Sequence, residues 1–219
     1  MNIIYEDNHL IIINKAPGEL SQSDITKDPS LVDDLKVYLK HKYQKKGNVY
    51  LGLVNRLDRP TSGLLIFSKT SKSLIRMNKI QKLRKIKKTY YAVTEKRPKN
   101  ESDQLINYLK KNQSKNKSFV VNENDPKAKK AILKYRLIKK LKNYFLLEVI
   151  LETGRHHQIR CQLSNIGCPI KGDVKYGAKR PNKDRSISLH SKKIEFTHPV
   201  SNKELTFIAE PPKSNIWLS

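Results

Sequence analysis

The sequence has few of the residues that build metal sites or disulfide frameworks. Its 219 residues include two cysteines and six histidines. Cys161 and Cys168 fit no zinc-binding spacing, and no second cysteine pair accompanies them. The histidines do not cluster along the chain as metal ligands do. We therefore expect no metal site, and we interpret both cysteines as buried, reduced thiols.

Targeting signals and cofactor motifs are also missing. No apolar run approaches the roughly 20 residues of a membrane-spanning helix. Residues 1–7 have neither the basic start nor the long apolar core of a signal peptide. There is no phosphate-binding glycine loop and no dinucleotide fingerprint. We therefore expect a cytoplasmic protein with no membrane partner and no small-molecule cofactor.

Acidic residues are scarce relative to basic ones. The chain has 45 Lys and Arg but only 20 Asp and Glu, a formal net charge of +25. This excess goes far beyond the needs of solubility and indicates a polyanionic partner. Charge alone leaves RNA, DNA and an anionic membrane surface open. The length and a hydrophobic fraction of 37% allow one large domain or two small ones.

One stretch, residues 54–67, has the pattern of a reactive loop. It places a single carboxylate, Asp58, between Arg56 and Arg59. Apolar runs on both sides read as buried strands, and a proline and a glycine make the middle a loop. Reactive side chains often occupy such loops. The simpler interpretation is that Asp58 is a turn former or a salt-bridge partner.

The apolar patterns predict more strands than helices. A helix begins after Ser30, with Asp33 completing an acidic variant of the capping box. Strands that gather in hairpins favour an α+β domain with a mostly antiparallel sheet. The expected strands span 3–7, 10–14, 64–67, 89–93, 131–138, 144–151, 193–198 and 204–209. The expected helices span 31–39, 71–83 and a segment between Gly154 and Gly167.

Two segments carry weaker signals. Residues 97–127 are polar, basic and low in complexity, and we interpret them as a loop or a partly mobile, variable insertion. A short helix is possible there around Leu105 to Leu109. Residues 144–151 have almost no polar positions, which favours a strand buried on both faces.

Three motifs, in order along the chain, resemble those of the RluA-type pseudouridine synthases. Residues 56–65 match the family signature R-L-D-R-x-T-S-G-L-L, although Asn55 stands where the commonest form has histidine. Residues 88–92 match K-x-Y-x-A, and residues 153–160 match T-G-R-x-H-Q-I-R. A further stretch, residues 168–177, is similar to the family's G-x-P-I-x-G-D-x-x-Y-G loop. The resemblance covers nearly the whole chain.

The resemblance assigns roles to individual residues. It implies that Asp58 is the catalytic carboxylate, that Tyr90 stacks against the target base, and that Arg160 pairs with the catalytic carboxylate. The simpler interpretations are a core tyrosine and a surface arginine. By the same resemblance Arg56 fills the space that a flipped base leaves, and Leu189 packs near that base.

Further substrate contacts are expected from positive charge. Arg59 is placed to hold a phosphate, and so is the basic run that precedes the second motif. The usual fate of such a run is a solvated face. The candidates in it are Lys85, Lys87 and Lys88.

The resemblance also implies the fold and the reaction. We expect one catalytic domain over residues 1–219, without the small N-terminal S4 domain of many relatives. The family's fold is a long, bent, mixed sheet with flanking helices and a central cleft. The reaction isomerises uridine to pseudouridine in ribosomal or transfer RNA, and we expect a monomer.

Two alternatives stay open at this point. One is a non-catalytic RNA-binding or ribosome-assembly factor on the same scaffold. The other, from composition alone, is a basic DNA-binding protein, although the sequence contains no helix-turn-helix or zinc-finger pattern.

Overall fold

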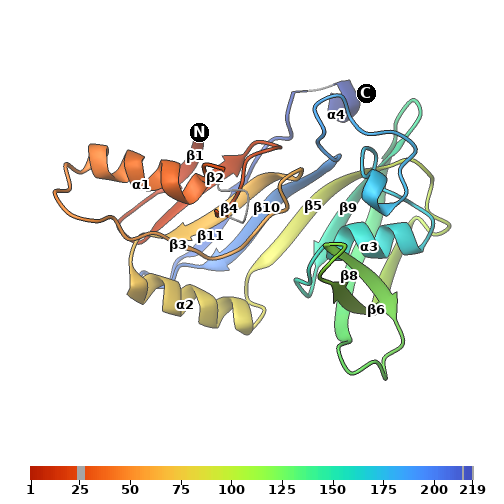
Figure 1. Ribbon diagram of the computed structural model, residues 1–219, viewed down its shortest axis with the longest axis horizontal. Helices are drawn as coiled ribbons and strands as arrows, with labels where there is room; N and C mark the ends of the chain where they lie inside the picture. The colour runs from red at the N-terminus through yellow and green to blue at the C-terminus, as the bar shows by residue number, and fades with distance from the viewer. Residues whose placement is uncertain (24–27, 214, 219) are drawn as a thin grey trace. The chain divides into compact units, whose positions relative to one another are not determined.

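The computed structural model describes residues 1–23, 28–213 and 215–218, which form an α+β protein (Figure 1). The strands are β1 (Asn2–Glu6), β2 (Leu10–Lys15), β3 (Gly52–Leu53), β4 (Ser62–Ser68), β5 (Lys87–Thr94), β6 (Ser102–Asn112), β7 (Lys117–Val121), β8 (Lys129–Lys140), β9 (Phe145–Leu151), β10 (Leu189–Thr197) and β11 (Glu204–Ile208). The helices are α1 (Leu31–Lys42), α2 (Ser71–Lys82), α3 (Gln158–Asn165), α4 (Asn215–Leu218) and the 3-10 helix η1 (Val174–Tyr176). The predicted α+β class is confirmed.

The chain divides into two compact units. The first unit contains Met1–Ile86 and Lys193–Glu210, and the second contains Lys87–Lys192 and Pro211–Ser219. The strand β10 therefore contributes its first residues to the second unit and the rest to the first. Every strand pair whose register is defined is antiparallel.

The sheet of the first unit is built on β2 and β4. These strands pair in antiparallel register, with Ile11 opposite Phe67 and Ile13 opposite Leu65. Side chains of both strands are buried at successive positions, so both faces of the sheet are covered. One face packs against α2 through Met77. The buried residues of this core are Leu10, Ile12, Val54, Leu64, Ile66, Met77, Ile86, Ile194, Phe196 and Ala209.

The N-terminus of α1 forms the predicted capping box. The Ser30 backbone N and hydroxyl both donate to the Asp33 carboxylate, at 3.2 and 2.6 Å. Leu31, Leu35 and Leu39 are its buried residues, at helical spacing.

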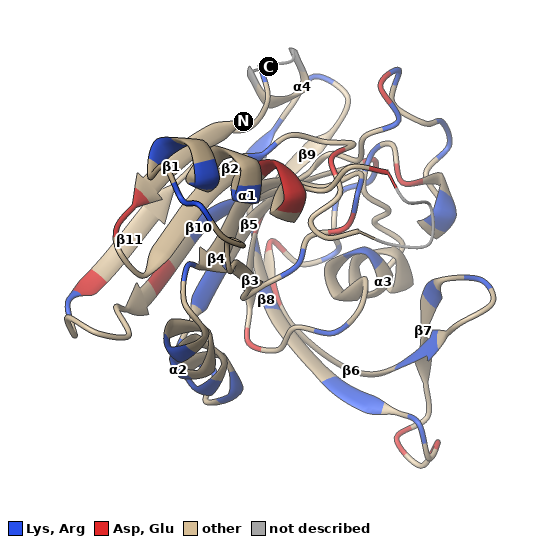
Figure 2. Cartoon of the chain, turned by 60° about the vertical axis from the view of Figure 1, so that its left-hand side comes forward, with Lys and Arg blue, Asp and Glu red and all other residues tan. Residues whose placement is uncertain are grey.

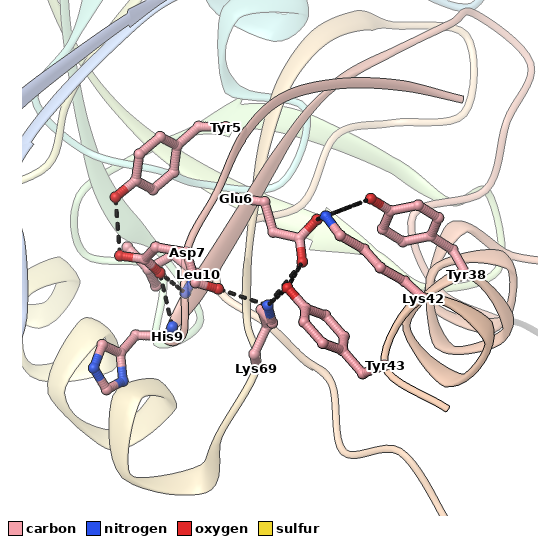
Figure 3. Close-up of polar contacts among 9 residues, drawn as sticks. All are labelled: Tyr5, Glu6, Asp7, His9, Leu10, Tyr38, Lys42, Tyr43 and Lys69. Carbon is pink, nitrogen blue, oxygen red and sulfur yellow. Dashed lines mark hydrogen bonds and ion pairs between the residues drawn. The ribbon is translucent and has the colours of Figure 1, made fainter. Parts of the chain in front are cut away.

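The C-terminal end of α1 is tied to the sheet by one carboxylate, Glu6, at the end of β1 (Figure 3). Glu6 accepts hydrogen bonds from the hydroxyls of Tyr38 and Tyr43, at 3.0 and 2.6 Å. It also pairs with the ammonium groups of Lys42 and Lys69, at 2.7 and 2.8 Å. We call these five residues the Glu6 network.

The second unit has the strand order β5-β9-β8-β6-β7. The helix α3 packs against β6 and β7, so this hairpin supports the helix that carries the third motif. The core beneath it contains Leu109, Ala131, Cys161 and Tyr176. Both cysteines are buried and free, as predicted.

Residues 97–127 are not a loop with a short helix, and that interpretation was wrong. They contain β6 and β7, a hairpin that continues into β8. Leu105 and Leu109 are both buried, while Ile106 is exposed. A spacing of four fits one turn of helix, but it also fits one face of a strand. Pairing with β8 decides between the two, and sequence periodicity does not contain that information.

The strand β9 differs from the expectation as well. Leu147 and Val149 are fully buried, but Ile150, which follows them, is 42% exposed. The strand therefore buries one face, and its apolar second face is partly open to solvent. In the part of the chain that the structure describes, no helix is long and apolar enough to cross a bilayer.

Candidate active site

The Asp58 loop joins β3 to β4 in the first unit. Asp58 is half-buried, and its carbonyl oxygen accepts a hydrogen bond from Thr61 N at 3.0 Å, closing a turn. Leu57, immediately before it, is buried and anchors the loop to the core. The predicted loop, held by strands at both ends, is confirmed.

Asn55 fastens the start of this loop to β4. Its side-chain oxygen accepts from Ile66 N at 2.8 Å, and its amide nitrogen donates to Leu64 O at 3.5 Å. The side chain is buried, so these backbone groups have no access to solvent for compensation. Asn55, the residue that departs from the family pattern, thus uses its side-chain amide to hydrogen-bond the backbone of β4, as a neighbouring strand would.

The segment after β2 that contains Gly18 and Ser21 is hydrogen-bonded to the Asp58 loop. The Ser21 hydroxyl donates to Leu57 O at 3.0 Å and accepts from Leu57 N at 3.4 Å. Gly18 N donates to Arg59 O at 2.8 Å, and Arg59 Nε donates back to Gly18 O at 3.0 Å. Gly18 has φ of 90°, a conformation that a residue without Cβ adopts at little cost. These reciprocal bonds fix the backbone on both sides of Asp58.

Lys15, at the end of β2, is a component that the sequence interpretation missed. It is 1% exposed, and its Nζ donates to the carbonyls of Ala16 and Arg59 at 2.8 and 3.0 Å. Burial lowers its pKa to about 8, although the carboxylates of Glu19 and Asp58 oppose that shift. The only signal in the sequence was a lysine closing an apolar strand.

The two arginines of the motif have different surroundings. Arg56 is exposed to solvent. Arg59 is also exposed, and its Nη1 lies 2.9 Å from the Asp28 carboxylate, with both side chains about half accessible. The predicted contacts of these two residues with RNA stay predictions.

The second motif lies on β5, in the second unit. Tyr90 is 6% exposed and pairs with Val149 of β9. Tyr91 is more exposed, and Lys192 Nζ lies 5.6 Å from its ring centroid. This difference in burial agrees with neighbouring residues that point to opposite faces of a strand.

The basic run before this motif is not uniform. Lys85 and Lys87 are exposed, as a solvated basic run predicts. Lys88 is half-buried, and desolvation lowers its pKa to about 8. Its ammonium group is therefore mostly charged at neutral pH but loses its proton more readily than an ordinary lysine.

The third motif folds into a braced turn followed by α3. The Gln158 side-chain oxygen accepts from the Thr153 hydroxyl at 2.8 Å and from Arg155 N at 2.9 Å. His157, which precedes the helix, is left-handed with φ of 52°. The turn sets where α3 begins, and therefore where Arg160 lies.

Arg160 is a buried cation rather than a surface residue. It is 5% exposed, and Asp173 is 1% exposed. Arg160 Nε and Nη2 donate to the two oxygens of Asp173 at 2.6 and 2.8 Å, a bidentate ion pair. The resemblance had not assigned a role to Asp173. The pairing of Arg160 with the catalytic carboxylate stays a prediction.

The aromatic ring of Tyr176 lies beside this pair. The guanidinium carbon of Arg160 is 5.0 Å from the ring centroid. The Tyr176 hydroxyl accepts from Ser118 N at 2.8 Å and lies 3.0 Å from His157 Nδ1. Burial is the largest cause that raises the pKa of Tyr176, so the phenol stays neutral.

The predicted site residues thus fall into two groups. Asp58, Arg56 and Arg59 share one loop of the first unit, where Lys15 joins them. Tyr90 and Arg160 belong to the second unit, as does Leu189, which is 4% exposed at the start of β10. Among the described residues, no three His, Cys, Asp or Glu side chains are arranged to hold a metal ion.

Solved structures define the fold class. The structure titled human RNA pseudouridylate synthase domain containing 4 matches with a TM-score of 0.81 at 21% identity, covering 97% of this chain and 89% of that one. The human domain containing 1 structure matches with a TM-score of 0.73 at 18% identity, covering 96% and 83%. The fold is the pseudouridine synthase fold, as predicted.

Sequence comparison gives the family. Residues 9–165 match the profile of the RNA pseudouridylate synthases. The chain is 36% identical over 216 residues to ribosomal large subunit pseudouridine synthase C of Rickettsia prowazekii, covering 96% of this chain and 68% of that protein. It is 31% identical over 223 residues to ribosomal large subunit pseudouridine synthase D of Zymomonas mobilis, covering 97% and 70%. This chain belongs to the RNA pseudouridylate synthase family.

Proposed function

We propose that this protein isomerises uridine to pseudouridine in large-subunit ribosomal RNA, with Asp58 as the catalytic carboxylate. The observation that carries the proposal is a family signature whose aspartate lies on a loop fixed on both sides by reciprocal hydrogen bonds. The names of its relatives supply the ribosomal substrate.

The reaction needs few chemical groups. The bond between uracil N1 and the ribose C1′ breaks, the base turns, and a bond forms between C5 and C1′. Atoms and electrons balance within the nucleotide, so the reaction requires no cofactor. A carboxylate acts as nucleophile on the ribose or as a base, and Asp58 takes that role. Tyr90 provides a face against the loose base, and Arg160 is the cation that acts with the carboxylate.

The rigid mounting of the Asp58 loop suits this chemistry. A reacting group held in place converts its attack into an effectively unimolecular step. Asn55, Ser21 and Gly18 each fix a different backbone segment of the loop, as described above. Lys15 adds a buried ammonium group that interacts electrostatically with the Asp58 carboxylate.

The target uridine must leave its stack before it can react. Flipping costs a few kcal/mol, which the protein is proposed to offset with inserted side chains and contacts to the flanking phosphates. Arg56 is proposed to fill the space that the flipped base leaves, and Leu189 is proposed to pack near that base. Figure 2 shows Lys and Arg recurring along α2 and one basic block on β6, in keeping with an RNA partner. The proposed phosphate contacts are Arg59, Lys85, Lys87 and Lys88.

Several broader features complete the proposal. We place the protein in the cytoplasm, where ribosomal RNA is modified, and we propose that it binds RNA as a monomer. Its 219 residues are proposed to act as one catalytic domain, with 97–127 as a variable part. Transfer RNA is a second substrate class that the family resemblance allows.

Pseudouridine mapping of total RNA tests the proposal. Cells lacking the protein are complemented with the wild type, with Asp58→Ala, or with Asp34→Ala as a matched change of an exposed carboxylate. We expect one or a few ribosomal uridines to lose modification in the deletion. Wild type and the Asp34 variant restore it, and Asp58→Ala does not.

The same experiment separates the enzyme from the non-catalytic alternative. An assembly factor would leave pseudouridine unchanged, and the Asp58→Ala protein would still rescue a defect in growth or ribosome assembly. That pair of results would end the catalytic assignment. Restored modification with Asp58→Ala would remove Asp58 from the chemistry.

A further inference from the structure

The ion pair between Arg160 and Asp173 fixes the guanidinium more strictly than a simple charge contact would. Two parallel hydrogen bonds, at 2.6 and 2.8 Å, join the Nε and Nη2 edge to both carboxylate oxygens. A bidentate contact of this kind sets the plane and rotation of the guanidinium. The remaining donors of Arg160 consequently point away from Asp173.

A second contact fixes the same group from its face. The Tyr176 ring centroid lies 5.0 Å from the guanidinium carbon of Arg160, within the range of a cation–π contact. Lys117 Nζ also lies over this ring, at 4.8 Å. The edge and the face of the Arg160 side chain are thus both held by protein groups.

Tyr176 is itself held in position. Its hydroxyl accepts a hydrogen bond from the backbone of Ser118 on β7 and is 3.0 Å from His157 Nδ1. The Ser118 hydroxyl donates to the backbone oxygen of His156 at 2.7 Å. The β6–β7 hairpin and the turn before α3 therefore meet at Tyr176, which supports the arginine between them.

Local backbone geometry explains why both supporting residues face the arginine. Asp173 is the N-cap of η1 and Tyr176 is its last residue, so they are three positions apart. In a 3-10 helix, side chains three positions apart lie on the same side. Tyr176 N donates to Asp173 O at 2.9 Å, which closes that turn.

A buried ion pair of this kind is weak evidence for a purely stabilising role. Desolvation of two charges offsets much of their attraction, and well-packed apolar residues often stabilise a core equally well. Orientation, in contrast, requires the charged pair, because only a carboxylate matches the guanidinium edge with two acceptors. The geometry of the pair therefore favours a positioning role.

We propose that Asp173 and Tyr176 are positioning residues that set the orientation of the Arg160 guanidinium for catalysis. The inference rests on the proposed function, in which Arg160 acts with the catalytic carboxylate. Asp173 fixes the edge of the group and Tyr176 fixes its face. Neither residue is assigned a contact with the RNA.

The principal test is Asp173→Asn, which keeps the size of the side chain but loses one acceptor and the charge. We expect kcat per folded molecule to fall about 100-fold, the cost of a catalytic group displaced by about 1 Å. RNA affinity and KM should stay within about threefold of wild type. Glu6→Gln is the matched control, because it also removes a buried paired carboxylate, and its kcat should be unchanged.

A double variant distinguishes positioning from general damage. In an Arg160→Lys background the bidentate edge is absent, so Asp173→Asn should lower kcat by less than about threefold further. Tyr176→Phe keeps the ring but loses the hydroxyl, and we expect a smaller decrease than for Asp173→Asn. Full additivity of the two changes in the double variant would contradict the proposal.

A direct measurement makes the outcome independent of turnover. The Arg160 Nε–H signal in nitrogen-15 NMR spectra should be rigid and protected in the wild type, and mobile in Asp173→Asn. A signal that stays rigid in the variant, or a wild-type kcat, would overturn the inference. Failure of the proposed function would appear differently, as a wild-type protein that forms no pseudouridine, and the NMR comparison would still decide the role of Asp173.

Discussion

The two units contain two buried ionic groups, the Glu6 network and the Arg160–Asp173 pair, whose hydrogen bonding differs. In the first unit, the Glu6 carboxylate is surrounded by two ammonium groups and two phenols (Figure 3). In the second unit, Arg160 and Asp173 meet through a planar, bidentate contact. Each carboxylate is almost completely buried, with 7% of the Glu6 side chain and 1% of the Asp173 side chain accessible.

The difference lies in redundancy. Burial by itself raises the pKa of Glu6, but its four hydrogen-bond donors outweigh burial and lower the pKa to about 2. Any one donor can be lost while others remain, and the flexible lysines can adjust. In the Arg160–Asp173 contact two parallel hydrogen bonds share one plane, so a change in either partner alters the geometry of both. Redundancy suits attachment of a helix, and a single strict geometry suits a reacting site.

The largest expected effect comes from breaking the strict pair. Arg160→Met should lower the free energy of unfolding by about 3–5 kcal/mol, because it leaves the Asp173 charge buried without its cation. Urea denaturation measures the change. The double variant Arg160→Met with Asp173→Leu should recover much of this stability without recovering activity. If the double variant is as unstable as the single one, the pair is needed for packing rather than for orientation.

An intermediate effect is expected from acid. The pKa of Glu6 is about 2 in the folded protein and near its ordinary value of 4.5 in the unfolded chain. The unfolded state thus binds more protons between these values, so stability falls as pH decreases from about 5 to about 2. The contribution lost is on the order of 2–3 kcal/mol.

The control for the acid prediction is Glu6→Gln. Because this variant has no carboxylate to protonate, its stability should depend less on pH, and its deficit relative to wild type should shrink as pH approaches 2. Thermal unfolding at a series of pH values provides the comparison. A deficit that stays constant across this range would mean that Glu6 is not responsible for the acid sensitivity.

The smallest effect should follow from removing one donor of the Glu6 network. Tyr43→Phe deletes a 2.6 Å hydrogen bond from a side chain that is 44% exposed. Three donors to Glu6 remain, so we expect a loss of about 0.5–1 kcal/mol in unfolding free energy, with no change in kcat. A loss above about 2 kcal/mol would show that the network acts as a single cooperative unit and lacks redundancy.

Much of the fold was predictable because local signals agreed with it. The capping box at Ser30 and Asp33 marked the start of α1, and the apolar runs on either side of Asp58 marked a loop between strands. The hairpin of β6 and β7 was not predictable from its polar composition. Its strand character comes from pairing with β8, an interaction between residues distant in the sequence.

The site shows the same division between local and distant information. Asp58, Tyr90 and Arg160 stand in recognisable motifs, and their proposed roles follow from those motifs. Asp173 stands in the matched loop of residues 168–177, but its role was not predictable because its partner Arg160 lies on another segment. Lys15 lies in no motif and gains its importance from contacts that include the Arg59 carbonyl. Glu6 is a similar case, since its four partners lie 32 to 63 positions away along the chain.

The short helix η1 imposes a constraint on length rather than on composition. Val174 and Lys175, the two residues between Asp173 and Tyr176, are exposed and free to vary in identity. Each residue of a 3-10 helix advances the chain by one third of a turn. One residue added or removed here would rotate Tyr176 by about 120° relative to Asp173. Natural variation in this loop should therefore consist of substitutions, while insertions and deletions should be confined to segments outside it.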